Sequence, residues 1–188
     1  MTQVIDSPFP FPAFNVSPTL TALFVALTLV VVAMDVALVR RAASATHAST
    51  WTWRAALAAL GWLALHALIA GLGVLQGAGP PPPIVFYLPP TMLLGVWVVF
   101  SAVGARLATL PLGLLVAAQA FRLPLEAWLH AAYDAGALPV QMTWSGNNFD
   151  VVTGASAVML GLLAVRGPLP RWLVAVWNVM GITLLVTV

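Results

Sequence analysis

Residues 19–41 read TLTALFVALTLVVVAMDVALVRR, an apolar run that is closed by two arginines. About 20 apolar residues in a helix are enough to cross the hydrocarbon core of a bilayer. The run holds one acidic residue, Asp35, about a turn and a half before Arg40. We expect its carboxylate to reach the membrane interface or to pair with Arg40 or Arg41. The stretch therefore predicts a transmembrane helix that ends at its arginines.

The composition extends this interpretation to the whole chain. Of 188 residues, 62% are hydrophobic and 6% are charged, whereas about 25% of the residues in a soluble domain are charged. We therefore expect an all-α polytopic transmembrane helical bundle, a single transmembrane domain over residues 1–188, with about six spans. The expected spans are residues 19–39, 55–75, 89–105, 111–134, 149–165 and 172–188.

Prolines and capping residues define several of these boundaries. The proline run at residues 80–83 cannot continue a helix and predicts an extended loop. Pro89 and Pro90 suit the first turn of the third helix, where a missing N–H is not needed. Asn148 as a cap and Asp150 as a first-turn acid predict the start of the fifth helix.

Six of the seven arginines predict the orientation in the membrane. They fall in alternate loops, and the positive-inside rule places such loops in the cytoplasm. We therefore expect a multi-pass protein of the cell inner (cytoplasmic) membrane with a non-cytoplasmic amino terminus. The last apolar run stops at Val188 without a polar flank, so we expect the natural chain to continue, with a seventh span as one alternative. The six arginines are Arg40, Arg41, Arg54, Arg106, Arg166 and Arg171.

Several function classes lack the residues that they need. The chain has no Cys, which excludes disulfides and thiolate chemistry. A net charge of +2 that is spread over loops is not a nucleic-acid footprint. The sequence also shows no metal-ligand spacing, no Ser–His–acid set and no glycine-rich phosphate loop. We therefore predict no metal and no nucleic-acid partner, and we favour a protein that is not an enzyme.

The seventh arginine lies inside the fourth expected span. An arginine at mid-membrane costs about 2.5–3.5 kcal/mol on insertion scales, so Arg122 needs a compensating group. Glu126 can pair with it at i, i+4, although acid before base is the better order on a helix. At about 100° per residue, the polar residues of this span share a face of roughly 120°. These residues are Gln119, Arg122, Glu126, His130, Tyr133 and Asp134.

This polar stripe has three interpretations. The most favoured is an internal ion-pair ladder that holds the helix against its neighbours. The second is a water-accessible cavity that binds a small ligand or relays protons, with His130 as the group that titrates near neutral pH. The third is docking on a partner subunit.

Two single polar residues in other spans give weaker signals. His66 lies in the middle of the second span, where a lone histidine is more often a hydrogen-bonded core residue than a ligand. A haem or chlorophyll bound through His66 is the less favoured alternative, so we predict no cofactor. Asn178, beside Trp177 in the last span, is expected to hydrogen-bond to a neighbouring helix.

Residues 121–126 read FRLPLE, and they are followed by His130 and by QMTWSGNNFD at residues 141–150. Together with the later Pro170-Arg171-Trp172 and Trp177-Asn178, this pattern resembles a family of uncharacterised bacterial polytopic membrane proteins. The likeness is confined to the part of the chain from the fourth span onward. Family members carry Phe and an acidic residue at the positions of Trp144 and Ser145, so Ser145 departs from the pattern.

The resemblance implies no activity, but it groups the face of Arg122 and Glu126 with the segment that precedes the fifth helix. In that segment Asn147, Asn148 and Asp150 are candidates to cap a polar cavity. Capping of the fifth helix alone is the favoured alternative for them.

These observations favour one function class over another. The favoured class is a non-enzymatic accessory or scaffold subunit of a membrane complex, or a small binding protein, with the lipid bilayer and other membrane subunits as partners. The alternative is a small-molecule or proton-coupled transporter, or a membrane enzyme, that uses Arg122, Glu126 and His130. Small size and the lack of internal repeats favour the first class, and the ionisable stripe favours the second.

Overall fold

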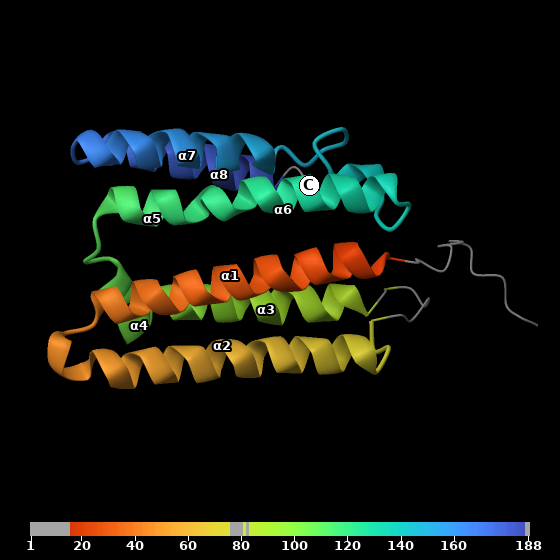
Figure 1. The fold of residues 1–188 in the computed structure, drawn as a ribbon, viewed down its shortest axis with the longest axis horizontal. Helices are drawn as coiled ribbons and strands as arrows, with labels where there is room; N and C mark the ends of the chain where they lie inside the picture. Colours follow the sequence, from red (N-terminus) through yellow and green to blue (C-terminus); the bar gives the residue numbers. More distant parts are fainter. Residues whose placement is uncertain (1–15, 76–80, 82, 187–188) are drawn as a thin grey trace, which may run out of the picture. The chain divides into compact units, whose positions relative to one another are not determined.

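Helices make up most of the residues that the computed structural model describes, namely residues 16–75, 81 and 83–186 (Figure 1). These residues form helices and turns but no strand, which confirms the all-α class. The expected proline loop at residues 80–83 lies partly outside the described residues, and the chain end at Val188 lies wholly outside them.

Within the described residues, three helical stretches are long and apolar enough to cross a membrane. The first is α1 (Pro18–Ala42). The second, Ala45–Gly71, consists of η1 (Ala45–His47) and α2 (Ala48–Gly71). The third, Leu112–Asp134, consists of α5 (Leu112–Ala118), η2 (Gln119–Phe121) and α6 (Arg122–Asp134). They overlap the expected spans at residues 19–39, 55–75 and 111–134.

The expectation of six spans is not confirmed. The remaining apolar helices α3 (Ile84–Val99) and α8 (Arg171–Val186) each have 16 residues. At 1.5 Å per residue such a helix is about 24 Å long, which is less than the roughly 30 Å of a hydrocarbon core. The spans expected at residues 89–105, 149–165 and 172–188 therefore stay predictions.

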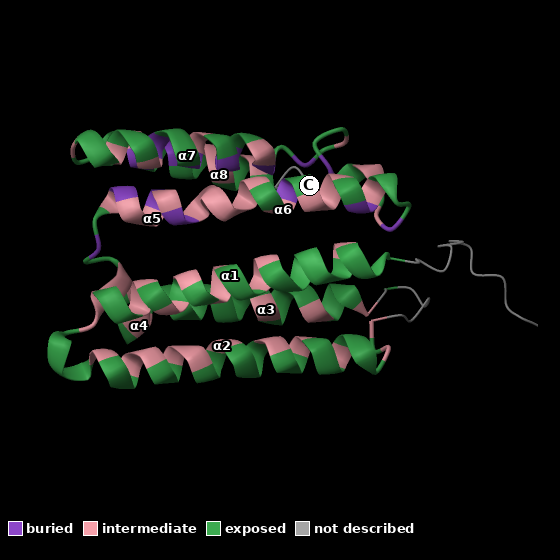
Figure 2. Cartoon of the chain, in the orientation of Figure 1, coloured by how far each residue is buried: buried purple, intermediate pink, exposed green. Residues whose placement is uncertain are grey.

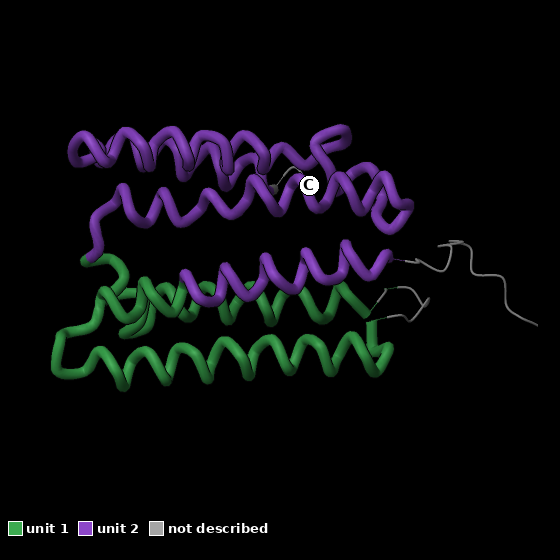
Figure 3. The backbone as a smooth tube through the Cα atoms, in the orientation of Figure 1, with its two compact units in different colours: residues 1–12, 35–109 green, residues 13–34, 110–188 purple. Residues whose placement is uncertain are grey.

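The described residues divide into two compact units (Figure 3). The first unit holds residues 35–75, 81 and 83–109, and the second holds residues 16–34 and 110–186. Helix α1 contributes residues up to Met34 to the second unit and residues from Asp35 onward to the first. The prediction of one transmembrane domain is not tested by this division.

The first unit has no buried residue among those described (Figure 2). Its helices expose large apolar side chains, including Leu57, Phe86 and Trp97, which are 66%, 67% and 66% exposed. Helix α4 (Ala102–Leu107) places the Arg106 guanidinium 4.7 Å from the centre of the Trp51 ring, at the start of α2. An apolar exposed surface of this kind suits a lipid environment.

Helix α2 begins earlier than expected. The structure starts it at Ala48, so that Arg54 lies inside the helix and not in the preceding loop. No proline or glycine interrupts the segment before Arg54, so the helix can begin at Ala48. Within it, Thr52 Oγ1 donates to the carbonyl of Ala48 at 2.7 Å. The expected end at residue 75 is also too late, since α2 ends at Gly71.

The third helix differs from the prediction at both ends. Helix α3 starts at Ile84, so Pro89 and Pro90 lie inside it and not in its first turn. Pro83 takes the position before the first helical residue, and its carbonyl accepts from the N–H of Phe86 at 3.0 Å. The helix therefore begins at Ile84, five residues before the expected start at Pro89. At its other end, α3 stops at Val99. Ser101 then caps α4 by accepting from the Val103 N–H at 3.2 Å.

The second unit contains every buried residue in the described part of the chain (Figure 2). Its core lies between α5, α7 (Asp150–Arg166) and α8, where five residues are buried together. A short helix, η3 (Val140–Met142), interrupts the loop between α6 and α7. The core residues are Val116, Ala157, Leu160, Val174 and Trp177.

The hydrogen bond between α7 and α8 comes from a different residue than expected. Trp177 Nε1 donates to Ser156 Oγ at 2.8 Å, whereas Asn178 is exposed and has no side-chain hydrogen bond to the described residues. The prediction for Asn178 is therefore wrong, because Trp177 occupies the face of α8 that packs on α7. A tryptophan N–H in such a core needs an acceptor, and Ser156 provides it.

Candidate functional site

The candidate site is built on the part of α6 that faces the start of α7. Arg122 is the first residue of α6, and Glu126 follows one turn later. Asn148 and Asp150 lie at the end of the preceding loop and at the first position of α7. Together with Gln119, these four residues form a connected group that we call the polar cluster.

Arg122 forms an ion pair with Asp150 and not with Glu126. Its Nη1 donates to Asp150 Oδ2, and its Nε donates to Gln119 Oε1 at 3.3 Å. The expected i, i+4 pair with Glu126 is therefore wrong, since the guanidinium points from α6 to α7. The tie across two helices compensates the charge that the sequence left without a clear partner.

The position of Asp150 has two independent causes. A carboxylate at the first position of a helix is favoured by the helix dipole, and Asn148 Oδ1 accepts the Asp150 N–H at 3.1 Å. One turn later, Gly154 lets α7 approach α6 closely, because a Cβ there would lie 2.8 Å from the backbone nitrogen of Leu123. The glycine brings the start of α7 within reach of Arg122.

Glu126 is only 1% exposed and depends on Asn148. Its Oε1 accepts from Asn148 Nδ2 at 2.9 Å, and the same amide nitrogen donates to the carbonyl of Met142 at 3.0 Å. With its oxygen bonded to the Asp150 N–H, Asn148 uses both its donor and its acceptor groups. The polar cluster is thus one continuous chain of hydrogen bonds from Gln119 to Glu126.

Four buried polar atoms near the cluster have no hydrogen-bond partner among the described residues. The cluster holds two carboxyl groups against one guanidinium, and each carboxyl group leaves one oxygen free. A buried acceptor without a partner costs about 1–3 kcal/mol, so these atoms need a donor such as water, a proton or a ligand. The atoms are Glu126 Oε2, Asp150 Oδ1, Thr153 Oγ1 and His130 Nδ1.

His130 continues the face of α6 beyond the cluster and stacks on a residue of the loop. Its ring lies 4.1 Å from the Trp144 ring, centre to centre, with the planes inclined by 16°. The Tyr133 ring lies 6.0 Å from His130 at a tilted angle. Trp144 therefore covers one face of the histidine ring.

Two predicted site residues stay outside these contacts. Asp134 and Asn147 are exposed, and their side chains have no hydrogen bond or ion pair with the described residues. The structure therefore brings Gln119, Arg122 and Glu126 of the predicted stripe together and leaves Asp134, at the end of α6, apart.

His66 lies in the other unit, where it is partly exposed and contacts residues of α2 and α3. Its Nδ1 lies 2.7 Å from the carbonyl oxygen of Trp62, and its ring contacts the rings of Trp62 and Tyr87 at 4.1 and 5.4 Å between centres. No group of three or more His, Asp or Glu side chains is placed to hold a metal within the described residues. The alternative of a pigment or haem at His66 stays a prediction.

Two residues near the cluster escaped the sequence analysis. Thr153 is 3% exposed and follows Asp150 by three residues, so it lies on the same face of α7. Thr143 is completely buried, and its Oγ1 donates to the carbonyl of Val140 at 2.9 Å. Helical spacing from Asp150 would have found Thr153, whereas no sequence signal separates Thr143 from an ordinary loop threonine.

Comparisons with known proteins return no matching family model, no similar curated protein and no similar solved structure. The resemblance of about the last 80 residues to a bacterial membrane protein family therefore stays a prediction. Any function must be argued from the geometry of the site.

We expect Gly154→Ala to destabilise the second unit by about 1–3 kcal/mol, as overpacking of a tight contact does. The new Cβ would lie 2.8 Å from Leu123 N and 3.1 Å from Arg122 Cβ, so α6 and α7 must separate. Unfolding of the purified protein in mild detergent measures the effect. Gly61→Ala in α2 is the matched control, since nothing lies within 4 Å of its added Cβ. Equal stability of the two variants would contradict the close approach of α7.

Proposed function

We propose that the chain is a non-enzymatic accessory or scaffold subunit of a membrane complex, whose polar cluster ties α6 to α7. In this proposal it resides in a bacterial inner membrane with its arginine-bearing loops in the cytoplasm and its amino terminus on the other side. The observation that carries the proposal is the ion pair of Arg122 with Asp150, which neutralises the arginine charge by a contact within the protein. A transporter would need that charge for its substrate.

A second feature of the cluster supports a structural role. Asn148 bonds to Glu126, to the Met142 carbonyl and to the Asp150 N–H, so it joins α6, the loop and α7. Hydrogen bonds that connect three elements in this way favour one arrangement of those elements. The exposed apolar side chains of the helices then remain for lipid and for other subunits.

The second candidate is a small binding protein, and the unpaired buried atoms favour it. Glu126 Oε2 and Asp150 Oδ1 are acceptors without a donor in the described residues. Donors such as water or a protonated ligand would satisfy these oxygens. This candidate and the first share the same fold and differ in whether the cluster has an occupant.

Purification of the full chain from its native membrane in a mild detergent, followed by native mass spectrometry, separates the two candidates. The accessory proposal predicts a companion protein at fixed stoichiometry, whose amount in the membrane falls when this chain is deleted. A monodisperse protein without a stoichiometric companion would overturn it. A small molecule that is retained by the wild type and lost from Glu126→Gln would instead establish the binding candidate. Gln141→Glu, an exposed position in the same loop, controls for a general effect of the substitution.

A further inference from the structure

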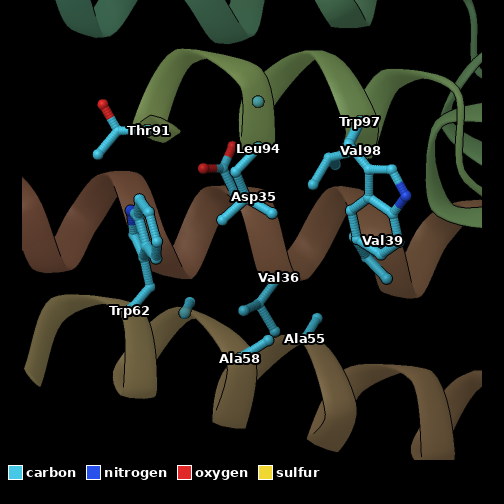
Figure 4. Close-up of a pocket in the computed structure, with 12 residues that line it drawn as sticks. Asp35, Val36, Val39, Ala55, Ala58, Trp62, Thr91, Leu94, Trp97 and Val98 are labelled. Atoms are coloured by element: carbon cyan, nitrogen blue, oxygen red, sulfur yellow. The ribbon is translucent and has the colours of Figure 1, made fainter. Parts of the chain in front are cut away.

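The first unit contains a cavity of about 460 Å³ that the polar cluster does not touch. Its walls are parts of α1, α2 and α3, and all of its lining residues belong to that unit (Figure 4). Most of the lining is small or aliphatic. Four residues give the cavity its chemistry, and they are Asp35, Trp62, Thr91 and Trp97. The volume lies within the range of about 300–1,000 Å³ that small-molecule sites occupy.

Asp35 is the one charged residue of the lining. The expected pair with Arg40 or Arg41 is absent from the structure, and Asp35 has no hydrogen bond or ion pair with any described residue. Figure 4 shows its carboxylate on the side of α3, beside Leu94. An aspartate within a membrane-spanning helix that faces a cavity is expected to have a partner of opposite charge.

The aromatic residues of the lining favour a cationic ligand, as the Asp35 carboxylate does. Trp62 and Trp97 contribute indole rings to the cavity from α2 and α3 (Figure 4). The face of an indole ring attracts a cation and gives an anion no such contact. Thr91 Oγ1 donates to the carbonyl of Leu88 at 2.7 Å, so its oxygen is left to accept a hydrogen bond.

We propose that this cavity binds a primary ammonium group that is attached to an apolar body. The ammonium pairs with the Asp35 carboxylate, and the apolar body lies against the indoles and the aliphatic wall. A free lipophilic amine and the head group of phosphatidylethanolamine both have this chemistry. The cavity is open to the surroundings of the unit, because Asp35 is exposed and Trp97 is 66% exposed.

The test uses the full chain in nanodiscs of phosphatidylcholine, which has no primary ammonium. Binding of octylammonium is measured by equilibrium dialysis against empty nanodiscs, and octanol is the neutral probe of equal chain length. We expect octylammonium to bind to the protein and Asp35→Asn to weaken this binding by about tenfold or more, because the charge pair in the cavity is lost. Asp134→Asn removes an exposed carboxylate elsewhere and is expected to leave binding unchanged.

A second variant tests the cavity without touching its charge. A Cβ on Gly95 would meet nothing within 4 Å, and Gly95 lines the cavity, so Gly95→Leu is expected to fill it and abolish binding while the helices stay intact. Equal binding of octylammonium by the wild type, Asp35→Asn and Gly95→Leu would overturn the proposal. So would octanol that binds as tightly as octylammonium, since the site would then be an apolar cavity only.

The lipid content of the nanodisc distinguishes the two sources of the ammonium group. If phosphatidylethanolamine is the natural occupant, its addition weakens octylammonium binding, and native mass spectrometry finds it retained by the wild type and lost from Asp35→Asn. If a free amine is the occupant, the affinity for octylammonium is the same in both lipids. Both results support the ammonium site, and they assign its source.

Discussion

Arg122→Ala is expected to lower the free energy of unfolding by about 3 kcal/mol, and adding Asp150→Ala in the same chain is expected to recover most of that loss. Breaking a buried ion pair leaves one charge uncompensated, which costs about 3–5 kcal/mol, whereas removing both charges leaves none. The Arg122 and Asp150 side chains are 23% and 12% exposed, so the lower end of this range applies. Equilibrium unfolding in mild detergent, analysed as a double-mutant cycle, measures the coupling.

The matched control combines Arg122→Ala with Glu126→Ala. Glu126 accepts from Asn148 and makes no ion pair with Arg122, so this double variant is expected to be at least as unstable as Arg122→Ala alone. The opposite result would be a recovery of stability in Arg122→Ala with Glu126→Ala and none in Arg122→Ala with Asp150→Ala. It would show that Arg122 pairs with Glu126 along α6 and not with Asp150 of α7.

Asn148→Asp is expected to destabilise the second unit by about 3 kcal/mol or more, although the two side chains have the same shape. The aspartate still accepts from the Asp150 N–H. It has no donor for Glu126 Oε1 or for the Met142 carbonyl, which then face another acceptor at 2.9 and 3.0 Å. Each buried acceptor that loses its donor costs about 1–3 kcal/mol, and a carboxylate beside a carboxyl group adds repulsion. Thermal unfolding followed by circular dichroism measures the difference.

Asn147→Asp makes the same chemical change at the neighbouring position. Asn147 is exposed, and its side chain makes no hydrogen bond with the described residues, so we expect a change of less than about 0.5 kcal/mol. If the two variants were equally stable, Asn148 would only cap α7, and the bond to Glu126 would contribute nothing.

Much of the fold could be predicted from the sequence because long apolar runs constrain a chain strongly. The run at residues 19–41 predicts α1, and the arginines that follow it coincide with the last turn of that helix. The boundaries of α2 and α3 were less well predicted. Nothing in the composition shows that a helix would begin at Ala48, before Arg54, or that another would begin at Ile84 and run through Pro89 and Pro90.

The residues of the candidate site could be predicted from the sequence, but the ion-pair partner of Arg122 could not. Arg122 and Glu126 share a face of one helix, which periodicity reveals, and Asn148 and Asp150 mark the start of the next helix. The partner of Arg122 depends on how closely α7 approaches α6, which Gly154 decides. A contact between residues 28 positions apart has no periodicity to reveal it. The stack of His130 on Trp144 is hidden from the sequence for the same reason.

The ion pair of Arg122 with Asp150 has a consequence for how the chain is made. The ribosome releases the arginine 28 residues before its aspartate. Until α7 begins to emerge, the stretch Leu112–Asp134 carries an unneutralised charge that makes lipid an unfavourable place for it. We therefore expect the stretch Leu112–Asp134 to enter a bilayer at little energetic cost only once the residues that carry Asp150 have been made. The order of synthesis, and not only the finished contact, then matters to its assembly.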